Sequence, residues 1–141
     1  MAQLTLFFDR CFGSGFPIWL RKVTTPFGVE YHDERKAGAN VHGFHDKTQD
    51  DDWLSVVGAK GWTVISHDKR FHKDTMASLA INQHNVACFY MDGGSLPPFD
   101  KMIVFARSYL RVREIIKTRK PPYIYRISHT GRVTLIKGGW P

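Results

Sequence analysis

The sequence predicts an α/β domain of three layers, in which helices cover both faces of a mostly parallel central sheet. The first observation is a series of apolar runs rich in β-branched and aromatic residues, which is typical of strands buried on both faces. The second is a set of amphipathic segments between these runs, which fit the connecting helices of such a sheet. The third is an alternating C-terminal segment with a Gly-containing turn, which predicts a β-hairpin.

The individual elements follow from periodicity and from helix start and stop signals. Parallel strands are expected at residues 4–8, 27–33, 62–66 and 86–91, and the hairpin at 123–137. The alternation of polar and apolar residues in 27–33 favours a position near the edge of the sheet. Helices are expected at 13–23, 50–60, 73–84 and 100–120. The inner face of the last helix is expected to carry Met102, Ile103, Ala106, Leu110 and Ile116.

The chain of 141 residues is expected to fold as a single domain, 1–141, with an α/β core over 1–120 and a hairpin and tail over 121–141. No apolar run reaches the length of a membrane span, and Asp9 comes too early for a signal peptide. We therefore expect a cytoplasmic protein that does not enter a membrane. The two cysteines, Cys11 and Cys88, are expected to be buried reduced thiols.

Acidic residues follow the predicted strands, although the formal net charge of the chain is +7. Asp9, Asp68 and Asp92 come within two residues after a predicted strand, and Asp33 ends the strand predicted at 27–33. Sites in parallel α/β sheets form at the carboxyl ends of the strands, so these side chains are expected at one edge. Such clustering costs free energy unless a cation compensates it. Carboxylate oxygens are the ligands that Mg²⁺ and Mn²⁺ prefer, and these ions promote hydrolysis of phosphodiesters.

Three further aspartates, Asp50 to Asp52, begin the helix that leads into the third strand. Acidic side chains stabilise a helix N-terminus, which is a sufficient reason for Asp51 and Asp52. Asp50 differs because it lies one turn before Trp53, on the helix face directed at the sheet. Asp68 has an alternative role as well, since it could cap the turn that follows its strand.

Two stretches together resemble the PIN-like nuclease superfamily: "LFFDR" (6–10) and "DDDWLSVVGAKGWTVISHDKRF" (50–71). The family has an Asp after its first strand. Later comes Asp, two residues, an apolar residue, a helix, Gly, a strand and Ser/Thr-x-Asp-x-x-Phe. Asp50, Trp53, Gly61 and the segment 66–71 match that order. The compact branch that includes relatives of VapC-type toxins is the most similar, so the resemblance implies a three-layer PIN-like fold.

The resemblance implies a ribonuclease that depends on Mg²⁺ or Mn²⁺, with Asp9, Asp50 and Asp68 as catalytic metal-binding carboxylates. Ser66 takes the position of a supporting residue that hydrogen-bonds a ligand carboxylate. The usual second acidic residue of the family has no clear counterpart, and Asp33, Glu34 or Asp51 is considered for it. Cys11 also departs from the family, which often has Asn or Ser there.

The resemblance also implies an RNA substrate, a cognate antitoxin as partner if the protein is a toxin, and possible homodimers. Basic residues near the predicted site and on the long helix are the candidates for RNA binding: Arg10, Lys69, Arg70, Lys73, Arg107 and Arg111. A solvated basic face is the alternative for Arg107 and Arg111.

Three functions compete at this point. The first is a metal-dependent endoribonuclease, and the second is a PIN-like module that binds nucleic acid with little or no turnover, which Cys11 and the missing acid favour. The third is phosphoryl transfer on Asp9, although haloacid-type phosphatases need an Asp where Cys11 stands. The histidines His32, His42, His45, His67 and His72 lack the paired spacing of a zinc motif, so solvated loop histidines are the alternative to zinc.

Overall fold

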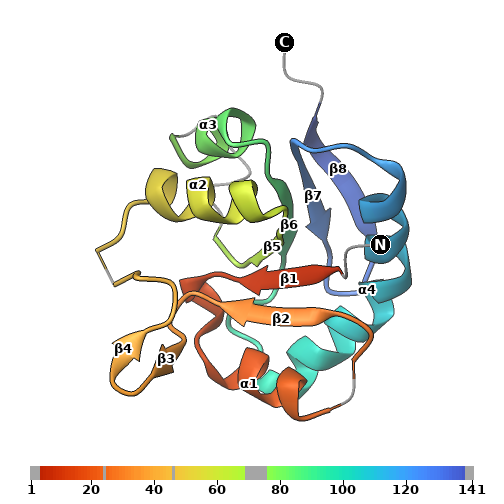
Figure 1. Cartoon of the computed structure of the whole chain (residues 1–141). Coiled ribbons are helices and arrows are strands. Elements are labelled where there is room, and N and C mark those ends of the chain that lie inside the picture. Colours follow the sequence, from red (N-terminus) through yellow and green to blue (C-terminus); the bar gives the residue numbers. More distant parts are fainter. Residues whose placement is uncertain (1–3, 24, 46, 69–75, 139–141) are drawn as a thin grey trace.

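A computed structural model describes residues 4–23, 25–45, 47–68 and 76–138 (Figure 1). Within these residues six strands form one sheet in the order β2-β1-β5-β6-β7-β8. They are β1 (Thr5–Phe8), β2 (Gly28–Tyr31), β5 (Thr63–Ser66), β6 (Ala87–Met91), β7 (Tyr123–Ile127) and β8 (Val133–Gly138). All neighbours are parallel except β7 and β8, which are antiparallel. The predicted fold class and C-terminal hairpin are therefore confirmed, and β2 lies at an edge as predicted.

Helices cover both faces of this sheet (Figure 1). They are α1 (Gly15–Lys22), α2 (Asp50–Lys60), α3 (Met76–Gln83) and α4 (Pro98–Thr118), with a 3₁₀ turn η1 (Arg10–Phe12) after β1. Helices α1 and α4 lie on one face, and α2 and α3 lie on the other. Residues 73–75, where the prediction began the third helix, lie outside the described residues. The predicted loop after β2 contains a small hairpin, β3 (Arg35–Lys36) and β4 (Ala39–Asn40).

The strand order changes direction between β1 and β5. The chain passes from β1 outward to β2, returns to β5 on the other side of β1, and continues outward through β6 to β7. In open parallel sheets a crevice forms at the carboxyl ends of the strands where the order reverses, and ligands bind there. Asp9 follows β1 and Asp68 follows β5 at this edge.

Strand β1 is the centre of two hydrophobic clusters, one on each face of the sheet. Phe7 and Phe8 are fully buried, and successive side chains of a strand point to opposite faces. On the side of α2 and α3, the ring of Phe7 stacks on Trp53, with ring centroids 5.6 Å apart. On the side of α1 and α4, the ring of Phe8 packs edge-on against Phe12. The end of β1, and with it Asp9, is fixed by packing on both faces.

The inner face of α4 differs from the prediction. Its buried residues are Val104, Phe105, Ser108, Val112 and Ile115. Of the predicted residues, Met102 and Ile116 are partly buried and pack against the core. Ile103 is partly buried, Ala106 is exposed and Leu110 is 66% exposed. The hydroxyl of Ser108 donates a hydrogen bond to the Phe105 carbonyl oxygen at 2.9 Å, so a polar residue can lie on the buried face.

One of the two cysteines also differs from the prediction. Both are free thiols, and Cys88 is buried as predicted, but Cys11 is exposed. The turn η1 buries Phe12, its apolar neighbour, and leaves Cys11 in solvent. Among the described helices, none combines the length and the apolar character needed to cross a membrane.

Gly58 in α2 provides a test of the contact between α2 and the segment that leads into β6. A Cβ atom at Gly58 would lie 2.3 Å from the carbonyl oxygen of His84. Replacing a helical Gly by Ala ordinarily stabilises by roughly 0.5–1 kcal/mol, but overpacking here should instead lower the free energy of unfolding by about 1–3 kcal/mol. Urea unfolding of Gly58→Ala measures this.

The matched control is Gly15→Ala, because nothing lies within 4 Å of a Cβ at Gly15. It should leave stability almost unchanged. A Gly58→Ala protein as stable as the parent would contradict the close packing of α2.

Candidate active site at the carboxyl ends of β1 and β5

Asp9 is a buried carboxylate, with only 4% of its surface exposed. Its position is fixed by the backbone, because its N–H donates to the Ile65 carbonyl oxygen of β5 at 3.2 Å. Its Oδ1 accepts a hydrogen bond from the backbone N–H of Cys11 at 3.1 Å, which caps the turn η1. The backbone of Cys11 therefore supports Asp9, whatever the side chain at that position.

Ser66 joins Asp9 to the segment that carries Asp68. The Ser66 side chain is fully buried and its hydroxyl donates a hydrogen bond to Oδ2 of Asp9. Ser66 Oγ in turn accepts a hydrogen bond from the backbone N–H of Asp68 at 2.9 Å. The geometry thus gives Ser66 the contact with Asp9 that its position in the sequence predicts, and it sets the direction of the chain after β5.

Burial raises the pKa of Asp9 from 3.8 to about 7. The hydrogen bond from Ser66 opposes this effect, and the negative charge of Asp68 and then that of Asp50 add to it. Asp50 and Asp68 therefore lie near enough to act electrostatically on Asp9. The ionised form of Asp9 is strongly disfavoured, and a nearby cation would reverse that preference.

Asp50 and Asp68 are half-buried. Asp50 is the first residue of α2 and not its N-cap, which is Gln49, and its Oδ1 accepts a hydrogen bond from Trp53 Nε1 at 3.0 Å. Trp53 itself is held by Phe7, so the core positions this carboxylate. The ligand oxygens of Asp9, Asp50 and Asp68 are not all within 4.8 Å of one another in the described structure, so the three form an open cluster.

The other acidic candidates have basic partners. Asp51 lies 2.7 Å from His84 Nε2, and Asp33 lies 3.0 Å from His32 Nδ1. Asp92 receives two hydrogen bonds from Arg126, at 3.0 and 2.7 Å.

Glu34 receives two hydrogen bonds from Arg21, at 2.7 and 2.8 Å. Burial raises the pKa of Glu34, but the hydrogen bonds and the charge of Arg21 outweigh it and lower the pKa. Each of Asp33, Glu34, Asp51 and Asp92 therefore has a basic partner outside the Asp9 cluster.

The basic candidates are only partly described. Lys69, Arg70 and Lys73 lie outside the described residues. Arg10 is exposed directly beside Asp9. Arg107 and Arg111 are exposed on α4, where Arg111 makes an ion pair with Glu114 at 3.1 Å and Arg107 packs against Gly131 of the hairpin turn.

Several histidines are not the solvated loop residues considered for them. His32 is 2% exposed. His67 is 9% exposed, and its ring stacks on that of Phe12 with the ring centroids 3.8 Å apart. Its Nδ1 lies 2.7 Å from the Met91 carbonyl oxygen. Burial lowers the pKa of His67 to about 4. His67 thereby links the end of β5 to the end of β6.

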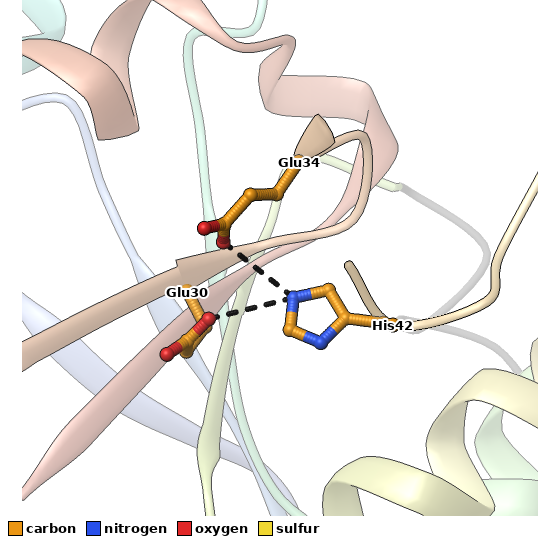
Figure 2. Close-up of side chains that lie close together, drawn as sticks. All are labelled: Glu30, Glu34 and His42. Atoms are coloured by element: carbon orange, nitrogen blue, oxygen red, sulfur yellow. Dashed lines mark ion pairs between the residues drawn. The ribbon is translucent and has the colours of Figure 1, made fainter. Parts of the chain in front are cut away.

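A second group of candidate ligands lies at the outer edge of β2 and was not predicted as a group. Glu30, Glu34 and His42 offer ligand atoms that all lie within 4.8 Å of one another (Figure 2). In the sequence, Glu30 shows only as a polar position in an edge strand, and His42 as one of several loop histidines. No periodicity joins them, because their proximity depends on how the 32–44 segment folds back.

Comparison with known proteins agrees with the fold and with the resemblance. A family model described as a PIN like domain matches residues 4–93, which is well over half of the chain and includes Asp9, Asp50 and Asp68. Searches of curated proteins and of solved structures gave no match.

The raised pKa of Asp9 predicts a stability that falls with pH. Between pH about 4 and 7 the folded protein holds a proton on Asp9 that the unfolded chain has released. A rise in pH through this window therefore lowers the free energy of unfolding. The loss at pH 8 is on the order of 4 kcal/mol for a pKa that moves from 3.8 to about 7.

Asp9→Asn should remove this dependence and be more stable than the parent at pH 8 in buffer with EDTA. Urea unfolding from pH 4 to 8 measures it, with the exposed Asp52→Asn as the control. Equal slopes for the parent and Asp9→Asn would contradict the shifted pKa.

Proposed function

Because the chain belongs to the PIN-like domain family, we propose that it is a metal-dependent endoribonuclease that hydrolyses phosphodiester bonds of RNA. Domains of this family are usually nucleases and generally use divalent metal ions. The observation that carries the proposal is Asp9, a buried carboxylate at the point where the strand order reverses. Its hydrogen bonds come from two neutral donors, the Ser66 hydroxyl and the Cys11 N–H.

The residues around Asp9 fit Mg²⁺ or Mn²⁺. Asp9, Asp50 and Asp68 offer carboxylate oxygens, the hard donors that these ions prefer. The charges of Asp50 and Asp68 disfavour the ionised form of Asp9, and a dication would compensate that cost. A bound ion of this kind supplies water activation for in-line attack and stabilises the charge on the phosphoryl oxygens.

The chain's own residues supply position and surroundings. Ser66 and the Cys11 N–H hold the two oxygens of Asp9 in fixed directions. Trp53 holds Asp50. Arg10 follows Asp9 in the sequence, and Lys69, Arg70 and Lys73 follow Asp68. These basic residues would bind the phosphates that flank the scissile bond, and Arg107 and Arg111 on α4 would bind other parts of the RNA.

A PIN-like module that binds nucleic acid with little turnover is the second candidate. The pairing of Glu34 with Arg21 and of Asp33 with His32 favours it. Both acids were considered for the family's second acidic residue, and each is paired with a basic side chain instead of joining Asp9, Asp50 and Asp68. Such a module would bind RNA through the same basic residues and would not need Asp9, Asp50 and Asp68 as metal ligands.

An RNA cleavage assay separates the two functions. With Mn²⁺ the protein should cleave single-stranded RNA, and EDTA should abolish the cleavage. Asp9→Asn and Asp68→Asn should each lower kcat/KM by at least about 100-fold, since groups that stabilise transition-state charge typically contribute that much. The matched control is Asp52→Asn, an exposed residue in the same first turn as Asp50, which should keep full activity.

Cleavage that survives EDTA or Asp9→Asn would overturn the nuclease assignment. RNA binding without cleavage, equal in the parent and Asp9→Asn, would establish the binding module.

We also propose that the ribonuclease is the toxin of a toxin–antitoxin pair and that its partner is a cognate antitoxin protein. The support is the resemblance of the segment 50–71 to the branch that includes relatives of VapC-type toxins. Induced expression in a bacterial host should stop growth, whereas Asp9→Asn, at equal expression, should not. Equal growth with both proteins would contradict the toxin role and leave the nuclease assignment to the cleavage assay.

A further inference from the structure

We propose that Glu30, Glu34 and His42 form a second metal site that binds Zn²⁺ at the outer edge of the sheet, apart from the Asp9 cluster. Glu30 lies in β2, Glu34 lies in the turn that follows β2, and His42 lies just beyond β4. Figure 2 shows the imidazole directed at both carboxylates. The site would fasten the segment that contains β3 and β4 to the edge strand.

The distances fit a shared ion better than direct hydrogen bonds. His42 Nε2 lies 3.4 Å from Glu30 Oε2 and 3.6 Å from Glu34 Oε1. These separations exceed the usual range of about 2.7–3.2 Å for N–H···O hydrogen bonds. They agree with the roughly 3.4 Å between neighbouring ligands of a tetrahedral ion with bonds of about 2.1 Å.

The buried Nε2 of His42 also lacks a hydrogen-bond partner among the described residues. Its side chain is only 5% exposed, and within the described residues Nε2 makes no hydrogen bond. Buried polar atoms in proteins nearly always have one. The nitrogen points at two carboxylates, which makes a cation the partner that would satisfy all three groups.

The loop that carries His42 is held rigidly. The Asn40 side chain accepts hydrogen bonds from the backbone N–H groups of His42 and Phe44, at 2.8 and 3.2 Å, and donates to the His32 carbonyl oxygen at 2.8 Å. The His42 ring packs against Phe44 and Trp62. Such support is what keeps a metal-binding imidazole in one orientation.

Two basic side chains act on the same group. Arg21 makes ion pairs with Glu34 at 2.7 Å and with Glu30 at 3.3 Å, and Lys60 acts electrostatically on Glu30 and on His42. Each carboxylate can accept several bonds, so it can contact both Arg21 and an ion. One imidazole nitrogen with two carboxylate oxygens suits Zn²⁺ and leaves a fourth position for water, whereas Mg²⁺ prefers oxygen ligands alone.

Zinc binding by the purified full-length chain tests the site. The parent should retain about one equivalent of Zn²⁺ after dialysis. Zn²⁺ but not Mg²⁺ should raise the Tm of Asp9→Asn, in which the proposed Mg²⁺ site is disabled. His42→Gln and Glu34→Gln should each weaken Zn²⁺ binding by at least about 10- to 100-fold, the range found when even a supporting partner is removed. The matched control is His45→Gln, an exposed histidine in the same loop, which should bind as the parent does.

Two further measurements keep the proposal independent of folding defects and of the nuclease. A Co²⁺ titration of the parent should give the visible absorption of a tetrahedral site. Asp9→Asn should bind Zn²⁺ as tightly as the parent, whether or not the parent cleaves RNA. Binding that is lost with Asp9→Asn but kept with His42→Gln, or no retained Zn²⁺ in the parent, would overturn the proposal.

Discussion

The burial of one carboxylate at the end of a central strand is the constraint on which the site depends. Strand β1 is packed on both faces, so Asp9, the residue directly after it, cannot move away from the interior to reach solvent. A buried carboxylate needs hydrogen bonds, and Asp9 obtains them from the Ser66 hydroxyl and the Cys11 N–H. These two bonds fix η1 on one side and the start of the segment after β5 on the other. The direction of Asp68 follows from them.

The described acids fall into two kinds. Asp92 has Arg126, Glu34 has Arg21 and Asp51 has His84, each within 2.7 Å. Such pairs are common in proteins, and those of Asp92 and Asp51 need no ligand to explain them. Asp9 differs because its contacts hold its geometry without compensating its charge, and because two further carboxylates raise its pKa. Strongly shifted pKa values of this kind are typical of functional sites.

The sequence predicted what depends on local patterns and on the topology of parallel sheets. Asp9 and Ser66 come together because adjacent parallel strands end at the same edge, and apolar runs identified those strands. The prediction for the inner face of α4 was wrong in part, because apolar residues occur on several sides of that helix and the periodicity fits two neighbouring faces. Ser108 lies on the buried face, and this polar residue hides the apolar pattern of that face in the sequence. The Glu30, Glu34 and His42 group could not be predicted, since it depends on how Asn40 folds the loop back.

The two candidate metal sites differ in the ions that their donors select. At the ends of β1 and β5 the candidate donors are carboxylate oxygens in an open cluster. Mg²⁺ and Mn²⁺ prefer such donors, and a bound ion would keep coordination positions for water and for a phosphate. At the edge of β2 an imidazole replaces one carboxylate and the loop is rigid, which favours Zn²⁺ in a more closed site. Zn²⁺ binds most nitrogen-containing sites more tightly than Mn²⁺, so the imidazole of His42 is the donor that distinguishes the two candidate sites.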